Sequence, residues 1–441
     1  MRTAVVGLGV TGMSCLRHLA GRDELVVVDT REQPPGLAEA MAAWPEVEYR
    51  LGAGAFEPGG LDRAILSPGI PTRSAMGRQV LGCGLPVLSD IDLFFAAVRE
   101  PVHAVTGTNG KSTVTSLVGH LLAAGGARPG LGGNLGLAAL DAIGPDRDCY
   151  VLELSSFQLA RMRTAPLRTA TILNVSGDHL DWHGSMDCYA AAKQRIYEGA
   201  ERAVANRSDA VTYPRAGSPA ELITFGGDEP EPGHWGIRAR RANRSLACGG
   251  RTLLETSRLP LAGGHNELNV LAALAMVHGG EFHGDVADLE GAVAGFSGLA
   301  HRSETVASVD AVTYVNDSKA TNPGAALAAL SGFGGAPGSV VLIAGGDGKG
   351  ADFTELGDAI AKSARHLVVL GADGPAIERA VGERVPVSGA RDMGEAVRQA
   401  AAAARPGDTV LLSPACASFD MFESFEARGA AFRDAVAELG A

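Results

Sequence analysis

The sequence predicts an α/β protein with three domains, each built around a mainly parallel sheet. The chain has 441 residues, which at about 150 residues per domain leaves room for three. Short apolar runs alternate with helical patterns, and the 59 glycines suggest many tight turns at strand ends. We expect a Rossmann-like N-terminal domain over 1–88, a P-loop-type central domain over 89–298 and a Rossmann-like C-terminal domain over 299–441.

The N-terminal domain should begin with a βαβ unit. Residues 3–7 predict a strand, residues 11–20 a helix, and Leu25–Asp29 the next strand. Short apolar runs predict two more strands at Ala64–Leu66 and Leu85–Leu88. The sequence pattern changes after these strands, so we place the first domain boundary near residue 89.

The central and C-terminal domains repeat this alternation of strands and helices. In the central domain we expect strands at Val102–Thr106, Tyr150–Leu154 and Thr171–Val175, and helices at Ser112–Ala123 and Ser185–Gly199. Residues 207–260 have weak periodicity and predict a peripheral sheet or long loops. In the C-terminal domain we expect strands at Val312–Val315, Val340–Ala344, Leu367–Leu370 and Val410–Leu412, and helices at Gly324–Leu330, Phe353–Ala364 and Met393–Ala404.

The composition argues against several classes of protein. The net charge of −12, without a basic run, argues against binding to nucleic acid or to an anionic membrane. The six cysteines are scattered, so we expect neither disulfides nor a zinc knuckle, and a location in the reducing cytoplasm. No run reaches the roughly 18 apolar residues of a membrane span, and glycines interrupt the N-terminus too often for an export signal.

The first glycine motif, Gly7-Leu-Gly-Val-Thr-Gly12, lies between a strand and a helix. Asp29 ends the next strand, about where a dinucleotide fingerprint places its acid. By itself this pattern suggests NAD, although any nucleotide diphosphate could bind at such a helix N-terminus. A purely structural turn is the alternative.

A second and more specific motif runs from Ala104 to Thr113 and contains Gly107-Thr-Asn-Gly-Lys-Ser112. Its amides, ammonium group and hydroxyls can hold a triphosphate and Mg²⁺. The motif resembles a P-loop but is not a strict Walker sequence, because position 105 is valine and the available glycine is Gly107. A glycine turn with a solvated lysine is the alternative.

Candidate metal ligands follow two of the central strands. Glu153 ends one strand, where an open α/β sheet presents its ligands. Asp178, His179, Asp181 and His183 follow the next strand. The two histidines could suggest zinc, but a second divalent-cation shell, substrate orientation or a purely structural role also fit.

Lys193 is out of place on the apolar stripe of its predicted helix, with Tyr189, Ile196 and Tyr197. Desolvation lowers the pKa of a lysine and frees its amine for reaction. One hypothesis is that it forms a carbamate with carbon dioxide and so becomes a metal ligand beside Glu153. Snorkelling of the side chain to solvent is the plainer explanation from the residues alone.

Polar clusters also lie at element boundaries in the last third of the chain. They are Gly264–Asn266 with Asn269, Ala300–Arg302, and Asn316–Asn322. Such residues suit adenine, phosphate and ribose. The segments Gly345–Lys349 and Ser413–Ser418 also follow strands and should meet Thr321 at one crevice, where Lys349 could bind a carboxylate.

Taken together, these motifs resemble the Mur ligase family along the whole chain. The resemblance is carried by residues 7–12 with 29–31, 67–70, 107–112, 152–158, 189–193, 264–266, 301–302, 316–322, 345–349 and 413–420. It is strongest to members that add D-glutamate to UDP-N-acetylmuramoyl-L-alanine in peptidoglycan synthesis. It implies successive domains for the uridine nucleotide, for ATP and for the amino acid, and a reaction through an acyl phosphate.

The resemblance also implies roles for individual residues. UDP-sugar binding is implied for Leu8, Thr11, Asp29, Thr30, Arg31, Ser67 and Asn134. ATP binding is implied for Thr108, Asn109, Gly110, Lys111, Ser112, Thr113, Asn266, Arg302 and Asp317. Two Mg²⁺ ions are implied at Ser112, Glu153, His179 and Lys193 as a carbamate, and catalytic roles at Lys111, His179 and Lys193. D-Glutamate binding is implied for Thr321, Lys349, Ser418 and Phe425.

Two positions depart from the family pattern: Ser303, where an apolar residue is common, and Met421, where glutamine is common. Three alternatives stay open. The chain could be a sister ligase that adds L-glutamate or another amino acid, a nicotinamide-dependent dehydrogenase built on Gly7–Gly12, or a nucleotide-binding regulatory protein with an inactive ATPase. We expect a monomer that binds neither nucleic acid nor membrane.

Overall fold

The computed structural model describes residues 1–215, 221–240, 243–261, 263–278, 286–334 and 336–439. It contains three sheets, one in each predicted domain, and the chain divides into two compact units. The first unit comprises Met1–Gly226, Pro230–Trp235 and Ala272–Leu289, and the second comprises Gly227–Glu229, Gly236–Leu271 and Glu290–Ala441. The three-domain α/β fold is confirmed, while the domain limits at 88 and 298 stay predictions.

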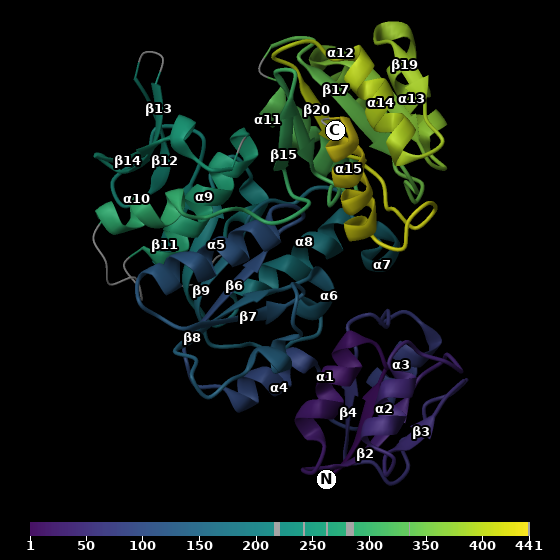
Figure 1. The fold of residues 1–441 in the computed structure, drawn as a ribbon. Helices are drawn as coiled ribbons and strands as arrows, with labels where there is room; N and C mark the ends of the chain where they lie inside the picture. The colour runs from purple at the N-terminus through teal and green to yellow at the C-terminus, as the bar shows by residue number, and fades with distance from the viewer. Residues whose placement is uncertain (216–220, 241–242, 262, 279–285, 335, 440–441) are drawn as a thin grey trace. The chain divides into compact units, whose positions relative to one another are not determined.

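The N-terminal sheet is parallel, with strand order β3-β2-β1-β4-β5. Alternate residues of its buried strands contribute to two separate apolar clusters, as expected for a sheet covered on both faces (Figure 1). Its elements are β1 Arg2–Val6, α1 Val10–Leu19, β2 Glu24–Val28, α2 Leu37–Ala43, β3 Glu48–Arg50, β4 Arg63–Leu66, α3 Ala75–Gly82 and β5 Val87–Leu88.

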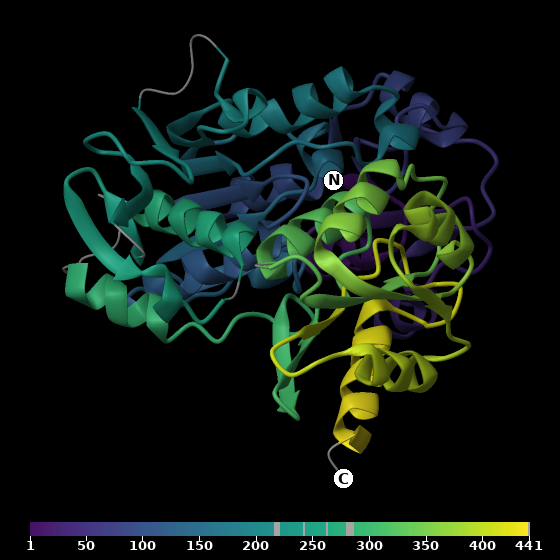
Figure 2. The same cartoon turned by 90° about the horizontal axis from the view of Figure 1, so that it is seen from above.

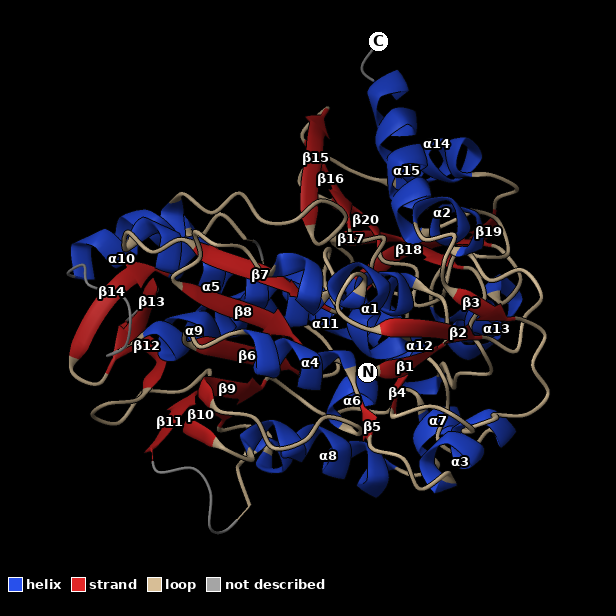
Figure 3. Ribbon diagram, turned by 90° about the horizontal axis from the view of Figure 1, so that it is seen from below, coloured by secondary structure: helices blue, strands red, loops and turns tan. Residues whose placement is uncertain are grey.

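The central sheet places the predicted phosphate loop at the carboxyl end of an inner strand. Its parallel strands follow the order β12-β11-β10-β9-β6-β8-β7 (Figure 3). The helices of this region are α4 Asp90–Ala97, α5 Lys111–Ala124, α6 Ser156–Leu159, α7 Leu180–His183 and α8 Met186–Gln194. The strands are β6 Val102–Thr106, β7 Pro129–Gly133, β8 Cys149–Glu153, β9 Leu167–Ile172, β10 Ala200–Asn206, β11 Glu221–Phe225 and β12 Trp235–Arg240.

Two central predictions are wrong in their limits. The strand expected at 171–175 is β9, which ends at Ile172. After Leu173 the backbone bonds to the phosphate loop, where the Thr108 N–H donates to Asn174 O at 2.9 Å. The helix expected at 185–199 ends at Gln194 and continues as a 3₁₀ turn, Arg195–Tyr197. This turn carries the buried Tyr197 hydroxyl to Ile172 N–H, which donates to it at 3.1 Å. The segment 207–260 contains strands, although 216–220 and 241–242 lie outside the described residues.

The second unit contains the C-terminal sheet, with strand order β15-β16-β20-β17-β18-β19. Figure 2 shows the ribbon of this region in green to yellow, towards the C-terminus. All neighbouring strands are parallel except the β15–β16 hairpin. Its elements are β15 Glu304–Val309, β16 Val312–Asn316, α11 Pro323–Phe333, β17 Val340–Gly345, α12 Thr354–Ser363, β18 Ala364–Leu370, α13 Gly374–Val381, β19 Val387–Gly389, α14 Met393–Ala403, β20 Thr409–Leu412 and α15 Phe425–Leu439. β13 Asn243–Cys248 and β14 Arg251–Glu255 also belong to the second unit, whereas α9 Gly264–Val277 and α10 Val286–Ala294 are divided between the two units.

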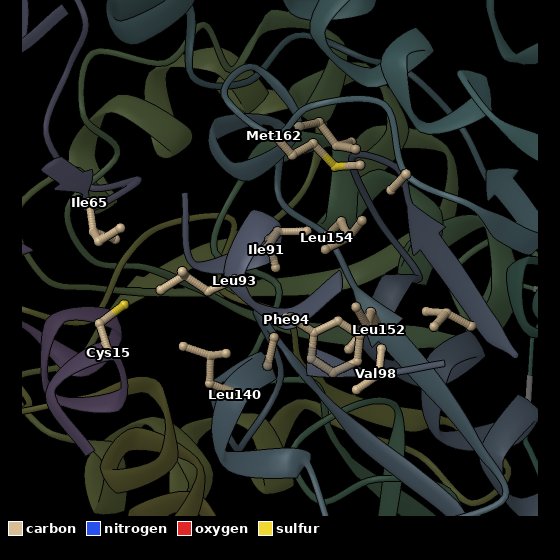
Figure 4. Packing of buried hydrophobic residues seen from close by; sticks show 14 of the residues in the cluster. Cys15, Ile65, Ile91, Leu93, Phe94, Val98, Leu140, Leu152, Leu154 and Met162 are labelled. Atoms are coloured by element: carbon tan, nitrogen blue, oxygen red, sulfur yellow. The ribbon is translucent and has the colours of Figure 1, made fainter. Parts of the chain in front are cut away.

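One apolar cluster in the first unit extends from the N-terminal sheet to the central sheet. It includes Cys15 of α1, Ile65 of β4, and Ile91 and Phe94 of α4, which precedes the central sheet in the chain (Figure 4). The Phe94 ring meets Tyr150 of β8 edge to face, with the centroids 5.2 Å apart. Among the described residues, no helix is long and apolar enough to cross a membrane.

Candidate active site

The first glycine motif forms a tight turn between β1 and α1. Gly7 adopts a positive φ of 98°, and a Cβ on Gly12 would lie 2.1 Å from the Gly7 carbonyl oxygen, so only glycine fits there. The Leu8 N–H donates to Asp29 Oδ2 at 2.8 Å. The loop and the end of β2 are therefore held together by the acid that the sequence singled out.

Asp29 is buried and carries an ion pair with the exposed Arg31, at 2.8 Å. Burial alone would raise the pKa of Asp29, but the hydrogen bonds from Arg31 and Leu8 outweigh it and hold the pKa below its ordinary value. Thr30 is exposed, and Thr11 and Ser67 are half-buried. These side chains lie at the carboxyl end of a parallel sheet, where ligands of open α/β folds bind.

The phosphate loop joins β6 to α5 and depends on two glycines. Gly107 has a φ of 156°, and Gly110 lies in the left-handed region with a φ of 85°. Lys111 Nζ donates to the carbonyl oxygens of Gly107 at 3.0 Å and Thr108 at 2.8 Å. The lysine folds over its own loop, so its ammonium group lies beside the N-terminus of α5, where anions bind.

Glu153 is 2% exposed and lies at the end of β8, next to the phosphate loop. Its carboxylate accepts hydrogen bonds from Ser112 Oγ at 2.6 Å and from Asn134 Nδ2 at 2.7 Å. The structure therefore brings Asn134 to Glu153. A Cβ on the neighbouring Gly133 would meet the Glu153 carbonyl at 2.3 Å, which explains the glycine.

This donor set fits Mg²⁺ better than zinc. A hydroxyl and a carboxylate oxygen 2.6 Å apart are ligands that Mg²⁺ uses together with substrate phosphates. Within the described part of the chain, no group of three or more His, Cys, Asp or Glu side chains could hold a metal ion. The zinc hypothesis for His179 and His183 therefore gains no support.

Lys193 is 1% exposed, so the snorkelling alternative is wrong. Its Nζ donates to the Gly107 carbonyl at 2.8 Å and lies 4.6 Å from the centroid of the Tyr189 ring. Burial lowers the pKa of Lys193 well below its ordinary value, and the nearby Lys111 lowers it further. The amine is therefore aimed at the phosphate loop and is easily deprotonated.

The two histidines after β9 have different surroundings. His179 is exposed, has a positive φ of 53°, and its Nε2 lies 3.6 Å from Asp178 Oδ2. His183 is buried, and its Nε2 lies 2.9 Å from Ser156 Oγ. His183 therefore supports the packing of α7 on α6, whereas His179 stays accessible to a ligand.

Two arginines that the sequence did not single out connect the Ser67 loop with α7. Arg161 donates to the carbonyl oxygens of Leu66 and Ser67, and Arg73 donates to the carbonyl oxygen of Trp182. The Arg161 guanidinium lies 5.9 Å from the centroid of the Trp182 ring. Burial lowers the pKa of Arg161 to about 10. Both contacts use main-chain acceptors, which no motif reveals.

In the second unit, three loops meet at the carboxyl end of the C-terminal sheet. Ser413 Oγ donates to Asp317 Oδ2 at 2.9 Å, and the Ser303 N–H donates to Asp317 Oδ1 at 3.1 Å. Burial raises the pKa of Asp317 to about 6, and these two hydrogen bonds oppose the rise. Asp347 and Ala417 exchange two backbone hydrogen bonds at 3.0 Å and 2.8 Å. The loops after β16, β17 and β20 therefore come together.

The predicted amino-acid residues lie on or near these loops. Ser418 is buried, Thr321 and Phe425 are half-buried, and Lys349 is exposed with a positive φ of 51°. Lys319 Nζ lies 3.7 Å from the centroid of the Phe425 ring. An exposed lysine at the end of a parallel strand is available to a carboxylate.

Arg428 is a further residue that the motifs did not reveal. It is 1% exposed, and it donates to the carbonyl oxygens of Ser318 at 2.8 Å and Cys416 at 3.1 Å. Burial lowers the pKa of Arg428 to about 10. This side chain braces two of the three loops from behind.

The predicted nucleotide residues of this unit also lie near Asp317. Asn266, at the start of α9, is buried and accepts a hydrogen bond from Asn269 Nδ2 at 3.1 Å. His265 Nε2 lies 3.3 Å from Ser303 Oγ, which connects α9 to the loop that contacts Asp317. The predicted site residues thus form two groups in the first unit, one around Asp29 at the N-terminal sheet and one around Lys111 at the central sheet. In the second unit they gather around Asp317.

Comparison with known proteins identifies the family. The N-terminal domain of MurD-like Mur ligases matches residues 1–89, the Mur ligase middle domain matches 105–277, and the glutamate ligase domain of Mur ligases matches 301–416. The chain is 46% identical to UDP-N-acetylmuramoylalanine--D-glutamate ligase of Pseudomonas aeruginosa, over 99% of this chain and 97% of that protein. The chain belongs to the Mur ligase family. The same enzyme of Marinobacter nauticus is 44% identical, over 99% of this chain and 98% of the relative.

Solved structures of other ligases share the fold at low sequence identity. A pseudomurein peptide ligase type C from Methanothermus fervidus aligns with a TM-score of 0.63 and 16% identity, over 99% of both chains. UDP-N-acetylmuramate-alanine ligase MurC from Thermotoga maritima aligns with a TM-score of 0.60 and 18% identity, over the whole of both chains. Family membership leaves the dehydrogenase hypothesis for Gly7–Gly12 without support.

Proposed function

We propose that this chain is an ATP-dependent ligase that joins D-glutamate to UDP-N-acetylmuramoyl-L-alanine in peptidoglycan precursor synthesis. The observation that carries the proposal is the convergence of Lys111, Ser112, Glu153 and Lys193 on one phosphate loop. The 46% identity with the Pseudomonas aeruginosa enzyme, over nearly the whole length of both chains, supports the choice of substrates. The six free cysteines fit a cytoplasmic location, and we expect a monomer.

ATP would bind with its phosphates on the loop 107–113. A related MurF ligase from Thermotoga maritima, with a TM-score of 0.60 and 17% identity, has been solved in complex with ADP. Lys111 would hold the phosphates, and Thr108, Gly110 and Thr113 would line the loop. In the second unit, Asn266, Arg302 and Asp317 would bind adenine, phosphate and ribose.

Mg²⁺ would be held by Ser112 and Glu153, and a second ion by His179 and the carbamate of Lys193. When bound, the ions would offset the negative charge of the phosphates during transfer. Carbamate formation needs a neutral amine, and the lowered pKa of Lys193 supplies one. The amine would attack carbon dioxide and lose a proton, so that an ammonium group is replaced by an anion.

The reaction would proceed in two steps. The carboxylate of UDP-N-acetylmuramoyl-L-alanine attacks the γ-phosphorus of ATP, ADP leaves, and an acyl phosphate forms, with Lys111 stabilising the transferred charge. The amine of D-glutamate then attacks the acyl carbonyl, loses a proton, and expels phosphate to form the amide bond. Leu8, Thr11, Asp29, Thr30, Arg31, Ser67 and Asn134 would bind the UDP-sugar, and Thr321, Lys349, Ser418 and Phe425 would bind D-glutamate.

Phosphate release tests the proposal directly. The protein is incubated with UDP-N-acetylmuramoyl-L-alanine, ATP and Mg²⁺, and with D-glutamate, L-glutamate or another amino acid in parallel reactions. Phosphate release that depends on D-glutamate is expected, and Lys111→Ala serves as the inactive control. Release with L-glutamate alone would identify a sister ligase. No release with any amino acid would identify a regulatory protein and contradict the proposal.

A further inference from the structure

The segment that follows β9 stays bonded to β6 through Leu173 and then runs along the phosphate loop. The Leu173 N–H donates to Thr106 O at 3.0 Å, and the Thr108 N–H donates to Asn174 O at 2.9 Å. The Ser176 N–H donates to Thr108 Oγ1 at 3.0 Å. The loop is therefore braced along one side by a second stretch of chain.

The Asn174 side chain also binds the phosphate loop, at the main chain of Asn109. Its Oδ1 accepts from the Asn109 N–H at 2.9 Å, and its Nδ2 donates to the Asn109 carbonyl at 3.1 Å. Both polar main-chain groups of Asn109 are thus bound by one carboxamide. Asn174 is only half-buried. Its importance for the loop therefore comes from its hydrogen bonds and not from tight packing.

These bonds determine which groups of the loop face a phosphate. The carbonyls of Gly107 and Thr108 accept from Lys111, and Gly107 also accepts from Lys193. The Asn109 carbonyl accepts from Asn174, so three successive loop carbonyls are bound within the protein. The first helical bond of α5 is Val114 N–H to Gly110 O at 3.0 Å. The helix therefore begins directly after these carbonyls, and a helix N-terminus is a place where anions bind.

We propose that Asn174 is a positioning residue for the triphosphate of the nucleotide. By binding the Asn109 peptide group on both sides, its carboxamide prevents that peptide from rotating its carbonyl towards the phosphates. A carbonyl oxygen turned towards the phosphates would repel them. The inference rests on the proposed function, because it assumes that the loop binds ATP.

The two neighbours of Asn174 are bonded from the opposite side of the segment. Asn206 Nδ2 donates to Leu173 O at 3.1 Å, and the Val175 N–H donates to Asp209 Oδ2 at 2.8 Å. Asn206 therefore bonds to the residue next to Asn174. Within the described residues its side chain bonds to Leu173 O and to the Ser208 N–H, and neither belongs to the phosphate loop. Asn206→Ala is a matched control for loss of a buried hydrogen bond in the same segment.

The test compares Asn174→Ala, Asn174→Asp and Asn206→Ala in the full-length protein. The measurements are the Kd for ADP with Mg²⁺ by calorimetry, the KM for each of the three substrates, and the thermal midpoint. Loss of two hydrogen bonds predicts that Asn174→Ala raises the Kd for ADP and the KM for ATP roughly tenfold to hundredfold. The KM values for the UDP-sugar and for D-glutamate should change less than about threefold.

The aspartate variant keeps the shape of the side chain but replaces the donor with an acceptor that faces the Asn109 carbonyl. We expect it to weaken ADP binding at least as much as Asn174→Ala, even if the alanine variant folds poorly. Asn206→Ala should lower the thermal midpoint and leave the Kd for ADP unchanged.

Three results would overturn the inference. They are an unchanged Kd for ADP in Asn174→Ala, an unchanged Kd in Asn174→Asp, or an equal rise in Asn206→Ala. Failure of the proposed function is a separate result, because the unaltered protein would then release no phosphate with any amino acid. The calorimetric comparison of ADP binding does not depend on that turnover.

Discussion

Replacing Asp90 with asparagine is expected to stabilise the protein above about pH 6. Asp90 begins α4 and is 2% exposed. Gln158 Nε2 donates to its Oδ2 at a long 3.3 Å. Burial raises the pKa of Asp90 from 3.8 to about 6, and the hydrogen bonds offset only part of that rise.

The size of the effect follows from this rise in pKa. Below the ordinary pKa of 3.8 the carboxyl group is protonated in the folded and unfolded states alike. Between 3.8 and about 6 only the folded state keeps the proton, so the free energy of unfolding falls as the pH rises. Above about pH 6 the loss in the free energy of unfolding is complete and amounts to about 3 kcal/mol. Asparagine resembles the protonated acid, so Asp90→Asn avoids this loss.

Urea denaturation at several pH values between about 4 and about 8 measures the difference. The variant should match the unaltered protein near the acidic end and exceed its free energy of unfolding by up to about 3 kcal/mol at the alkaline end. Asp146→Asn is the control, because that side chain is 85% exposed. A stability difference for Asp90→Asn that does not vary with pH would refute the reasoning.

Three further predictions concern activity. Lys193→Ala should lower kcat at least about a hundredfold, and added short carboxylic acids should restore part of the lost activity. If the variant keeps an activity close to that of the unaltered protein, a carbamate at Lys193 is excluded. Lys349→Ala should raise the KM for the amino acid about tenfold and leave the KM for ATP almost unchanged, and equal changes in both would argue against its assigned role. Arg161→Met should raise the KM for the UDP-sugar about tenfold, because the Ser67 carbonyl loses a charged donor. The exposed Arg163 provides the control, Arg163→Met, and an equal effect of the two variants would show that the contact with Ser67 is unimportant.

The sequence predicted well those features that depend on residues close together in the chain. The glycine turn between Val102–Thr106 and the helix beyond it needs only local backbone geometry, and β6 and α5 lie where this pattern placed them. The assignment of Glu153 to a strand end followed from a short apolar run. Strands such as β7, with its glycines, gave no apolar signal and were missed.

The burial of Lys193 could not be predicted from the sequence pattern. Its position on an apolar helix stripe allowed either snorkelling or burial, and only the packing of α8 against the phosphate loop decides for burial. Asn174 lies 65 positions from Asn109, and Arg428 lies 110 positions from Ser318, so no spacing rule reveals either contact.

By itself, the sequence determined the α/β class, the phosphate loop and the family, because turns, strand ends and motifs are encoded by neighbouring residues. The tertiary structure decided which side chains brace those loops and which ionisable groups lose their water. Hydrogen bonding and desolvation depend on the atoms that folding brings close, and those atoms come from distant parts of the chain.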